Sequence, residues 1–313
     1  MLLVISSKKV FAAKRMEQEC RIQNTECRIM DVRDLVDCGF KVDIKQFDVL
    51  YVRSPYLSGS PKYIPDIIKL AKKFKTAGKR VVDSSITEGK LGQGKWPDYQ
   101  KLQNASLPIP ATRLLSNYQL STINYPLVLK WTYGFKAKNV FLVKNPEQLK
   151  KILPLHPKKE WLVQEFIKAE YEYKVVTVGY KALPVVLRFK IKDSGFRTDF
   201  NKAEVIYYRR HSEGVHKADL SAEALAKVQE SQIQDKEILR PESAWAQDDA
   251  VSEVIKIAEQ STRLLKRELA KVDILEAGGK LYILEVNRFP GLKSFEELTK
   301  YNVTKDFLSY LSR

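Results

Sequence analysis

The stretch that most constrains the fold lies near the end of the chain, where Lys271–Gly291 reads KVDILEAGGKLYILEVNRFPG. Two short apolar runs flank the sequence Glu-Ala-Gly-Gly, a pattern that predicts a β-hairpin. Because side chains alternate between the two faces of a strand, we expect Ile283, Glu285 and Asn287 on one face. The chain must therefore place polar side chains within an otherwise apolar ribbon.

If Ala277–Gly279 forms the loop of this hairpin, Asp273 is expected opposite Ile283 and diagonal to Glu285, on the same face. Two carboxylates and the Asn287 amide then converge at the mouth of a sheet. An unpaired buried charge costs several kcal/mol, so these groups need a partner. Mg²⁺ suits them, because it takes oxygen ligands, usually one or two carboxylates with phosphates and waters. A salt-bridged hairpin on a solvated face is the alternative that these residues alone leave open.

The composition sets the class of protein. A chain of 313 residues buries a large core and divides into two or three structural units. No apolar run approaches the roughly 20 residues that cross a bilayer. The five-residue apolar run at the N-terminus has no basic segment before it, so no signal peptide is expected. Cys20, Cys27 and Cys38 lack CxxC spacing and are expected to be reduced, structural thiols of a cytoplasmic protein.

The net charge of +16 favours polyanionic partners, namely nucleotide phosphates, nucleic acid or an acidic peptide. Lys and Arg are spread along the whole chain and do not form a basic stripe interleaved with aromatic residues, which argues against nucleic acid. His211 and His216 have no Cys or third His at metal-ligand spacing, and we expect them to be solvated.

The first part of the chain, residues 1–88, alternates strand-like and helix-like segments, which predicts a parallel sheet. The sequence after its first strand is Ser6–Lys9, where a dinucleotide-binding unit has a glycine-rich turn. This unit is therefore expected to line a substrate pocket and not to bind a nucleotide by itself.

The middle of the chain carries two further candidate elements. Tyr125–Lys130 is a buried strand, and the loop after it, which contains Gly134, has the shape of a flap over phosphates. Trp161–Ile167 is a strand whose backbone can hydrogen-bond a purine. Taken alone, a strand-terminal lysine such as Lys130 is more often a solvated surface group, and Glu165 fits a solvated residue of an ordinary edge strand at least as well.

The order of these parts is more specific than any of them. LPIPAT, YPLVLK with a flap, VQEFI, VDIL and EVNRFPGL follow one another, and the chain resembles the ATP-grasp superfamily, most closely its RimK-like carboxylate–amine ligase branch, over residues 80–313. The resemblance implies an α/β (α+β) ATP-grasp fold, with a Rossmann-like N-terminal pre-ATP-grasp domain and two α+β subdomains that sandwich ATP. The implied boundaries are 1–88 for the N-terminal domain, 89–313 for the ATP-grasp domain, 110–178 for its lid subdomain, 179–313 for its C-terminal subdomain, and 211–246 for an insertion.

The resemblance also assigns roles to individual positions. It implies that Arg188 steadies the transferring phosphate as the catalytic residue, because a guanidinium is a permanent, bidentate cation. It implies Asp273, Glu285 and Asn287 as ligands of two Mg²⁺ ions, which Mn²⁺ can replace. The implied ATP-binding residues are Lys95, Lys130, Gly134, Lys138, Glu165, Phe166, Ile167, Glu172 and Lys174, of which Glu165–Ile167 hold adenine and Glu172 the ribose. The segment 195–201 resembles the family's substrate segment only loosely, and it offers Arg197, Asp199 and Asn201 as substrate ligands.

Several positions depart from the family pattern. Of three flap glycines only Gly134 is present, with Ala137 and Asn139 at the other two places. Asn tolerates a positive φ, so we expect Asn139 to take the conformation of the missing glycine. Gly94 stands where the family has an aspartate, and Lys174 stands where it more often has arginine.

The implied function is an ATP- and Mg²⁺-dependent carboxylate–amine ligase that forms an amide through an acyl phosphate and adds an amino acid to an acidic peptide or small molecule. Two alternatives are a phosphotransferase on the same architecture and a non-catalytic basic nucleotide- or RNA-binding protein with a decayed flap. No membrane partner is expected. The oligomeric state and the identity of the substrates are left open by the sequence.

Overall fold

The computed structural model describes residues 1–53, 61–115, 124–134, 139–156, 160–191, 198–207 and 249–312, and for residues 61, 198–203 and 249 the backbone alone. Within these residues the chain forms three β-sheets, each from a successive part of the sequence. The predicted insertion 211–246, with His211 and His216, lies outside the described residues. The division into separate domains stays a prediction.

The first sheet is parallel, as the alternating pattern predicts, and has the order β2-β1-β3-β4. Helix α1 packs on one of its faces, and α2 and α3 pack on the other. The elements are β1 (Leu2–Ile5), α1 (Phe11–Ile22), β2 (Cys27–Met30), α2 (Val32–Asp37), β3 (Val49–Val52), α3 (Ile64–Thr76) and β4 (Arg80–Val82).

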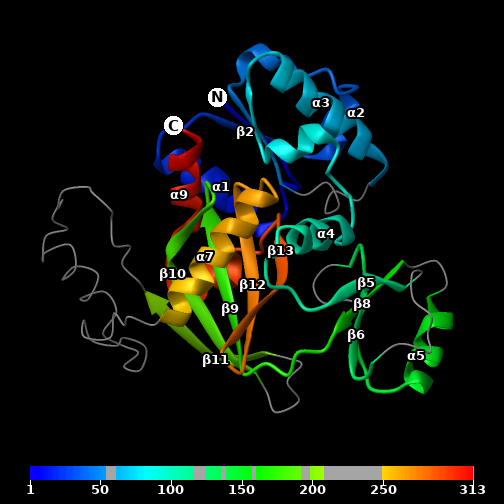
Figure 1. Cartoon of the computed structure of the whole chain (residues 1–313). Coiled ribbons are helices and arrows are strands. Elements are labelled where there is room, and N and C mark those ends of the chain that lie inside the picture. The colour runs from blue at the N-terminus through cyan, green and yellow to red at the C-terminus, as the bar shows by residue number, and fades with distance from the viewer. Residues whose placement is uncertain are drawn as a thin grey trace, which may run out of the picture.

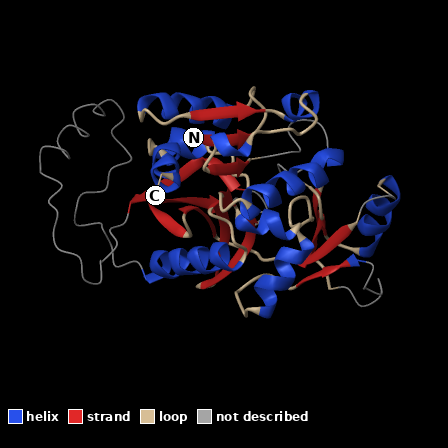
Figure 2. Ribbon diagram, turned by 90° about the horizontal axis from the view of Figure 1, so that it is seen from above, coloured by secondary structure: helices blue, strands red, loops and turns tan. Residues whose placement is uncertain are grey.

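The second sheet is small and antiparallel, in the order β5-β8-β6-β7, and we call it the lid sheet. Figure 2 shows this sheet and its helix set to one side of the rest of the molecule. Helix α4 comes immediately before the lid sheet in the sequence. The elements are α4 (Trp96–Asn104), β5 (Thr112–Leu114), β6 (Leu127–Trp131), β7 (Val140–Val143), α5 (Pro146–Ile152) and β8 (Trp161–Glu165).

The third sheet is antiparallel, has the order β11-β10-β9-β12-β13 and carries the predicted hairpin. The lid boundary at residue 178 is wrong, because β9 hydrogen-bonds to β10 and β12 at the centre of this sheet. The elements are β9 (Tyr171–Val178), β10 (Lys181–Ile191), β11 (Thr198–Tyr207), α7 (Asp249–Leu264), β12 (Leu269–Ala277), β13 (Lys280–Asn287), α8 (Lys293–Thr299) and α9 (Val303–Leu311).

The register of the hairpin differs from the expected one. The turn is Gly278-Gly279, with both residues at positive φ, which is the conformation of a tight two-residue hairpin turn. A β-bulge then leaves Leu284 without a partner, so that Asp273 lies opposite Glu285 and not opposite Ile283. The bulge also moves Ile283 to the other face from Glu285. The predicted pair of carboxylates is present, but a different register brings it together.

The two faces of the five-stranded sheet have different coverings. Helix α7 covers one face, which we call the α7 face, where it packs on residues such as Val175, Val272 and Ile283 (Figure 1). Residues such as Val176 and Leu187 point to the opposite face, where part of the sheet packs against α1, α8 and α9. Because side chains alternate along a strand, the place of a residue in its strand tells which of the two faces it lies on.

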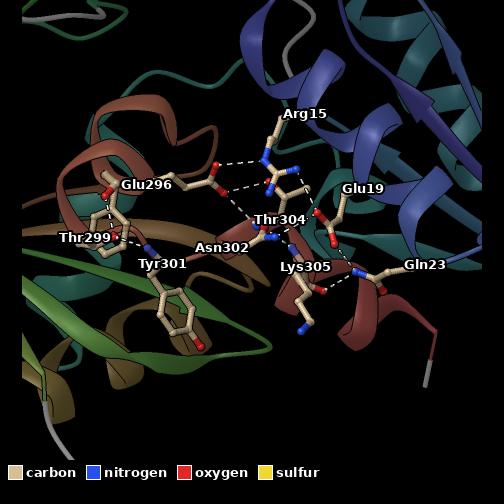
Figure 3. A network of polar contacts seen from close by, with 10 residues as sticks. Arg15, Glu19, Gln23, Glu296, Thr299, Tyr301, Asn302, Thr304 and Lys305 are labelled. Atoms are coloured by element: carbon tan, nitrogen blue, oxygen red, sulfur yellow. Dashed lines mark hydrogen bonds and ion pairs between the residues drawn. The ribbon is translucent and has the colours of Figure 1, made fainter. Parts of the chain in front are cut away.

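A partly buried polar network joins α1 to the C-terminal helices (Figure 3). Arg15 forms ion pairs with Glu19 at 3.0 Å and with Glu296 at 3.5 Å. Asn302 donates a hydrogen bond to Glu19 at 3.0 Å, and the backbone and hydroxyl of Thr304 donate to Glu296 at 3.1 Å. These contacts, beside the apolar core, hold the parallel sheet against the five-stranded sheet.

Candidate active site

The carboxylates of the hairpin gather at one place. Asp273 of β12 and Glu285 of β13 are directly opposite each other, and Asn287 lies two residues further along β13. The Asn287 amide donates a hydrogen bond to Asp273 Oδ2 at 3.1 Å. The other carboxylate oxygen of Asp273, Oδ1, is buried and accepts no hydrogen bond within the described ranges.

Lysine ammonium groups surround these carboxylates. Lys174 and Lys271 lie 3.6 Å and 3.5 Å from Asp273 Oδ1. Lys174 also donates to Glu172 at 2.5 Å, and Lys95, at the start of α4, donates to Glu285. Burial lowers the pKa of Lys174, but the charges of Asp273 and Glu172 outweigh this effect and raise it above its ordinary value.

The lid sheet contributes a further lysine. The Lys130 side chain of β6 is buried, and in the described part of the chain its ammonium has no ion-pair partner within 4 Å. Burial first, and then the charge of Lys95, lowers the pKa of Lys130 to about 7. Burial alone raises the pKa of Glu285, but the charges of Lys95 and Lys130 hold it below its ordinary value. Glu285 is therefore ionised at neutral pH.

Three contacts fix the edge strand that carries Glu285 and Asn287. The Tyr99 hydroxyl donates to the carbonyl of the bulged Leu284 at 2.6 Å. The Arg267 guanidinium donates to the carbonyl of Val286, and the backbone N–H of Ile283 donates to Pro108 at 2.7 Å. Backbone groups that the sheet leaves without a partner are thus satisfied from α4 and its neighbours, which holds the bulge in place.

Gly94 has a structural explanation. A Cβ at this position would lie 3.0 Å from the Thr132 Cβ and 3.1 Å from the Thr132 carbonyl oxygen. The next residue, Lys95, donates its backbone N–H to that same carbonyl at 2.9 Å. An aspartate at position 94 would force the backbones apart, so glycine allows Lys95 to approach Glu285.

The predicted hinge and flap are described in part. Glu165 ends β8, and its carboxylate accepts a hydrogen bond from the Ala111 backbone at 3.3 Å. Phe166 and Ile167 lie in the segment that connects the lid sheet to β9. Asn139 has a φ of 60°, which confirms that it takes the left-handed conformation that glycine adopts readily. Gly134 follows β6 in a turn, whereas Lys138 and Ala137 lie outside the described residues.

Arg188 lies in the expected strand, but the structure does not bring its side chain to the carboxylates of the hairpin. On β10, Leu187 pairs with Lys174, while Arg188 pairs with Tyr173 on the α7 face. The Arg188 guanidinium forms an ion pair with Glu204 at 2.6 Å. It therefore points away from Asp273, on the opposite side of the sheet. Arg197 and the side chains of Asp199 and Asn201 lie outside the described residues.

The residue that the sequence analysis missed is Lys271. It precedes Asp273 by two positions on the same strand, so the two side chains share a face. The alternation along β12 alone was a sufficient signal.

The donor set fits magnesium. Asp273, Glu285 and Asn287 offer two carboxylates and an amide oxygen, and Asp273 Oδ1 lacks a hydrogen bond. Among the described residues no three His, Cys, Asp or Glu side chains are grouped as a metal site. Magnesium held by one or two carboxylates is completed by phosphates and waters, so this set suits a metal that arrives with a nucleotide.

The comparison with known protein families agrees with this geometry. A family model described as an ATP-grasp domain matches residues 93–291, which is more than half of the chain. The chain belongs to the ATP-grasp family. The matched range begins just before Lys95 and ends just after Asn287, so it contains the whole cluster of lysines and carboxylates.

Whole-chain comparisons extend this assignment. A probable alpha-L-glutamate ligase of Haemophilus influenzae is 20% identical over 337 residues, covering 99% of this chain and 96% of its own length. The solved structure of an ATP-grasp RimK domain protein from Sphaerobacter thermophilus has a TM-score of 0.61 at 13% identity, covering 100% of this chain and 99% of its own. That of the ATP-grasp ligase PsnB, with a phosphomimetic precursor variant, Mg and ADP, has a TM-score of 0.64 at 14% identity, covering 99% and 97%.

These comparisons confirm two predictions, namely the ATP-grasp fold and an ATP-grasp ligase. No helix among the described residues is both long and apolar enough to span a membrane.

Proposed function

We propose that this ATP-grasp ligase joins a carboxylate to an amine through an acyl phosphate, at the expense of ATP. The observation that carries the proposal is the direct pairing of Asp273 with Glu285 on a sheet face that also presents Lys174 and Lys271. Anionic and cationic groups of this kind in one place suit a metal-bound triphosphate better than they suit a structural salt bridge.

The roles follow from position. We assign Asp273, Glu285 and Asn287 to magnesium, which when bound spreads the charge that develops on the phosphates. Lys95 and Lys130 approach from α4 and the lid, and we assign them to the phosphates of ATP. The backbone after β8, at residues 165–167, is assigned to adenine. Glu172 is assigned to the ribose, and to bind it the Glu172 carboxylate must give up its hydrogen bond with Lys174.

The chemistry needs no nucleophilic side chain. The substrate carboxylate attacks the γ-phosphorus, the bond to ADP breaks, and an acyl phosphate remains. The amine then attacks the acyl carbon, phosphate leaves, and the amine gives up a proton to solvent. In both steps negative charge grows on oxygens, and a fixed cation lowers that barrier. Lys271, held 3.5 Å from Asp273 Oδ1, is our candidate for this cation in place of Arg188.

We propose an acidic amino acid as the amine-bearing substrate and an acidic peptide as one candidate acceptor. The proposal has three supports: the net charge of +16, the name of the glutamate ligase relative, and the precursor peptide bound to PsnB in another solved structure. A strongly basic protein attracts anionic substrates over a long range.

An ADP-release screen over pairs of carboxylates and amines, with mass spectrometry of the products, tests the proposal. We expect ADP to form only when both a carboxylate and an amine are present, together with Mg²⁺. ADP release with a carboxylate alone and a phosphorylated product would instead indicate a phosphotransferase. No release with any pair, despite tight nucleotide binding, would favour a non-catalytic binding protein.

The Lys130 pKa predicts a proton linkage. In the free protein this pKa is about 7, so at pH 8 the Lys130 side chain is neutral in most molecules. Bound phosphates stabilise the charged form and raise the pKa, so MgADP binding at pH 8 is expected to take up about one proton. The affinity for MgADP is therefore expected to be highest below the free-state pKa of Lys130 and to fall as the pH rises above 7. Calorimetry in HEPES and in Tris buffers, which differ in ionisation enthalpy, measures the uptake.

Lys130→Arg is the matched control for this linkage, because arginine keeps the charge and does not titrate in this range. It is expected to bind MgADP without proton uptake. Equal uptake in the wild type and in this variant would show that another group takes the proton.

A further inference from the structure

The parallel sheet holds polar groups that the proposed chemistry does not use. Ser6 follows β1, and Arg53 follows β3, and the two residues are only 1% and 6% exposed. The Ser6 hydroxyl and the Nε and Nη1 groups of Arg53 are buried and have no hydrogen-bond acceptor within 3.5 Å in the described part of the chain. The Arg53 guanidinium lies beside the buried Tyr51 hydroxyl and its charge acts on it. Buried donors without partners are uncommon and costly, and a permanent cation is the most costly of them.

The place of these two residues in the sheet is significant. In the order β2-β1-β3-β4, β2 is added on one side of β1, and β3 and β4 are added on the other, so the carboxyl ends of β1 and β3 form the topological switch point. In open parallel sheets, ligands bind in the crevice at this point. Ser6 and Arg53 are neighbours there, because the backbone N–H of Arg53 donates to Ile5 at 2.9 Å.

The surroundings favour an anion. Helix α1 begins five residues after Ser6, no side chain caps its N-terminus, and its first turn contains no acidic residue. The positive end of a helix attracts negative charge. The third polar group of Arg53, Nη2, donates to the Pro290 carbonyl at 2.8 Å. Pro290 lies three residues after Asn287, so the site borders the loop that leaves the carboxylate cluster.

We propose that Arg53 and Ser6 form a carboxylate-binding subsite for the acidic amino acid substrate. The subsite would hold a carboxylate that does not react and would set the specificity for an acidic amine-bearing substrate. The inference rests on the proposed ligase function, and it extends that function to a residue pair outside the part of the chain that the family model matches.

The test uses L-glutamate as the probe and the full chain saturated with MgADP. Calorimetric titration is expected to show that L-glutamate binds the wild-type complex. Arg53→Lys, which keeps the charge but loses the guanidinium donors, is expected to weaken this binding at least roughly tenfold. Ser6→Ala is expected to weaken it roughly fivefold. The affinity for MgADP is expected to remain unchanged in both variants.

Two controls separate recognition from folding. Ser6→Ala removes a hydroxyl that makes no hydrogen bond, so its melting temperature is expected to stay the same or to rise. Thr177→Val removes another buried hydroxyl without a partner, on the α7 face, and is expected to leave L-glutamate binding unchanged.

Wild-type protein that binds MgADP but not L-glutamate would overturn the subsite. So would variants that bind L-glutamate as tightly as the wild type, or a crystal structure of the complex with only ordered water at Arg53. Wild-type protein that does not bind MgADP would instead contradict the proposed ligase function on which the subsite rests.

Discussion

Replacing Glu285 with glutamine is expected to abolish ADP formation, with kcat lowered by at least roughly 10³-fold. Glu285 is ionised at neutral pH, because the charge of Lys95 holds its pKa below its ordinary value. Glutamine keeps the size of the side chain but removes the negative charge that magnesium requires. The fold is expected to persist, since the Lys95–Glu285 pair is partly exposed and such pairs contribute about 1 kcal/mol or less.

The matched control is Glu204→Gln. Glu204 is also paired with a cation, Arg188, in the same sheet, but on the α7 face. ADP formation in this variant is expected to stay close to that of the wild type. Steady-state ADP release and thermal unfolding of both variants give the comparison. Turnover by Glu285→Gln at the wild-type rate would remove Glu285 from the metal site.

Replacing Lys271 with methionine is expected to lower kcat by about 10²–10³-fold while the affinity for MgADP changes only slightly. The Lys271 ammonium lies beside Asp273, where we propose that charge grows on the transferring phosphate, so its effect is expected on the reaction and not on nucleotide binding. Single-turnover ADP formation, together with calorimetric MgADP binding, separates the two effects.

Arg188→Met provides the contrasting variant. Because Arg188 contacts Glu204 and packs 5.0 Å from the Tyr171 ring, its loss is expected to lower the melting temperature and to change kcat by less than about threefold. If Arg188→Met abolished turnover and Lys271→Met did not, the face of the sheet assigned to the reaction would be wrong.

Much of the site can be predicted from the sequence alone. The turn glycines, the apolar alternation and the acidic residues of the hairpin predict Asp273 near Glu285. The register was wrong because a bulge at Leu284 depends on partners far away in sequence, Tyr99 among them. A one-residue shift changes the face of every later side chain, so local patterns do not determine it.

Arg188 shows a second limit. Its assignment rested on resemblance, whereas its direction depends on how β10 pairs with β9. Strand pairing is long-range information that no local pattern contains. Gly94 shows the converse case, because a departure from the family pattern becomes a close backbone approach once Thr132 is seen beside it.

Crystals grown with a non-hydrolysable ATP analogue and Mn²⁺ test the central claim most directly, since manganese is located by its anomalous scattering. We predict manganese within about 2.5 Å of oxygens of Asp273 and Glu285, and in contact with the phosphates. Nucleotide bound elsewhere, or bound here with manganese distant from both carboxylates, would contradict the account.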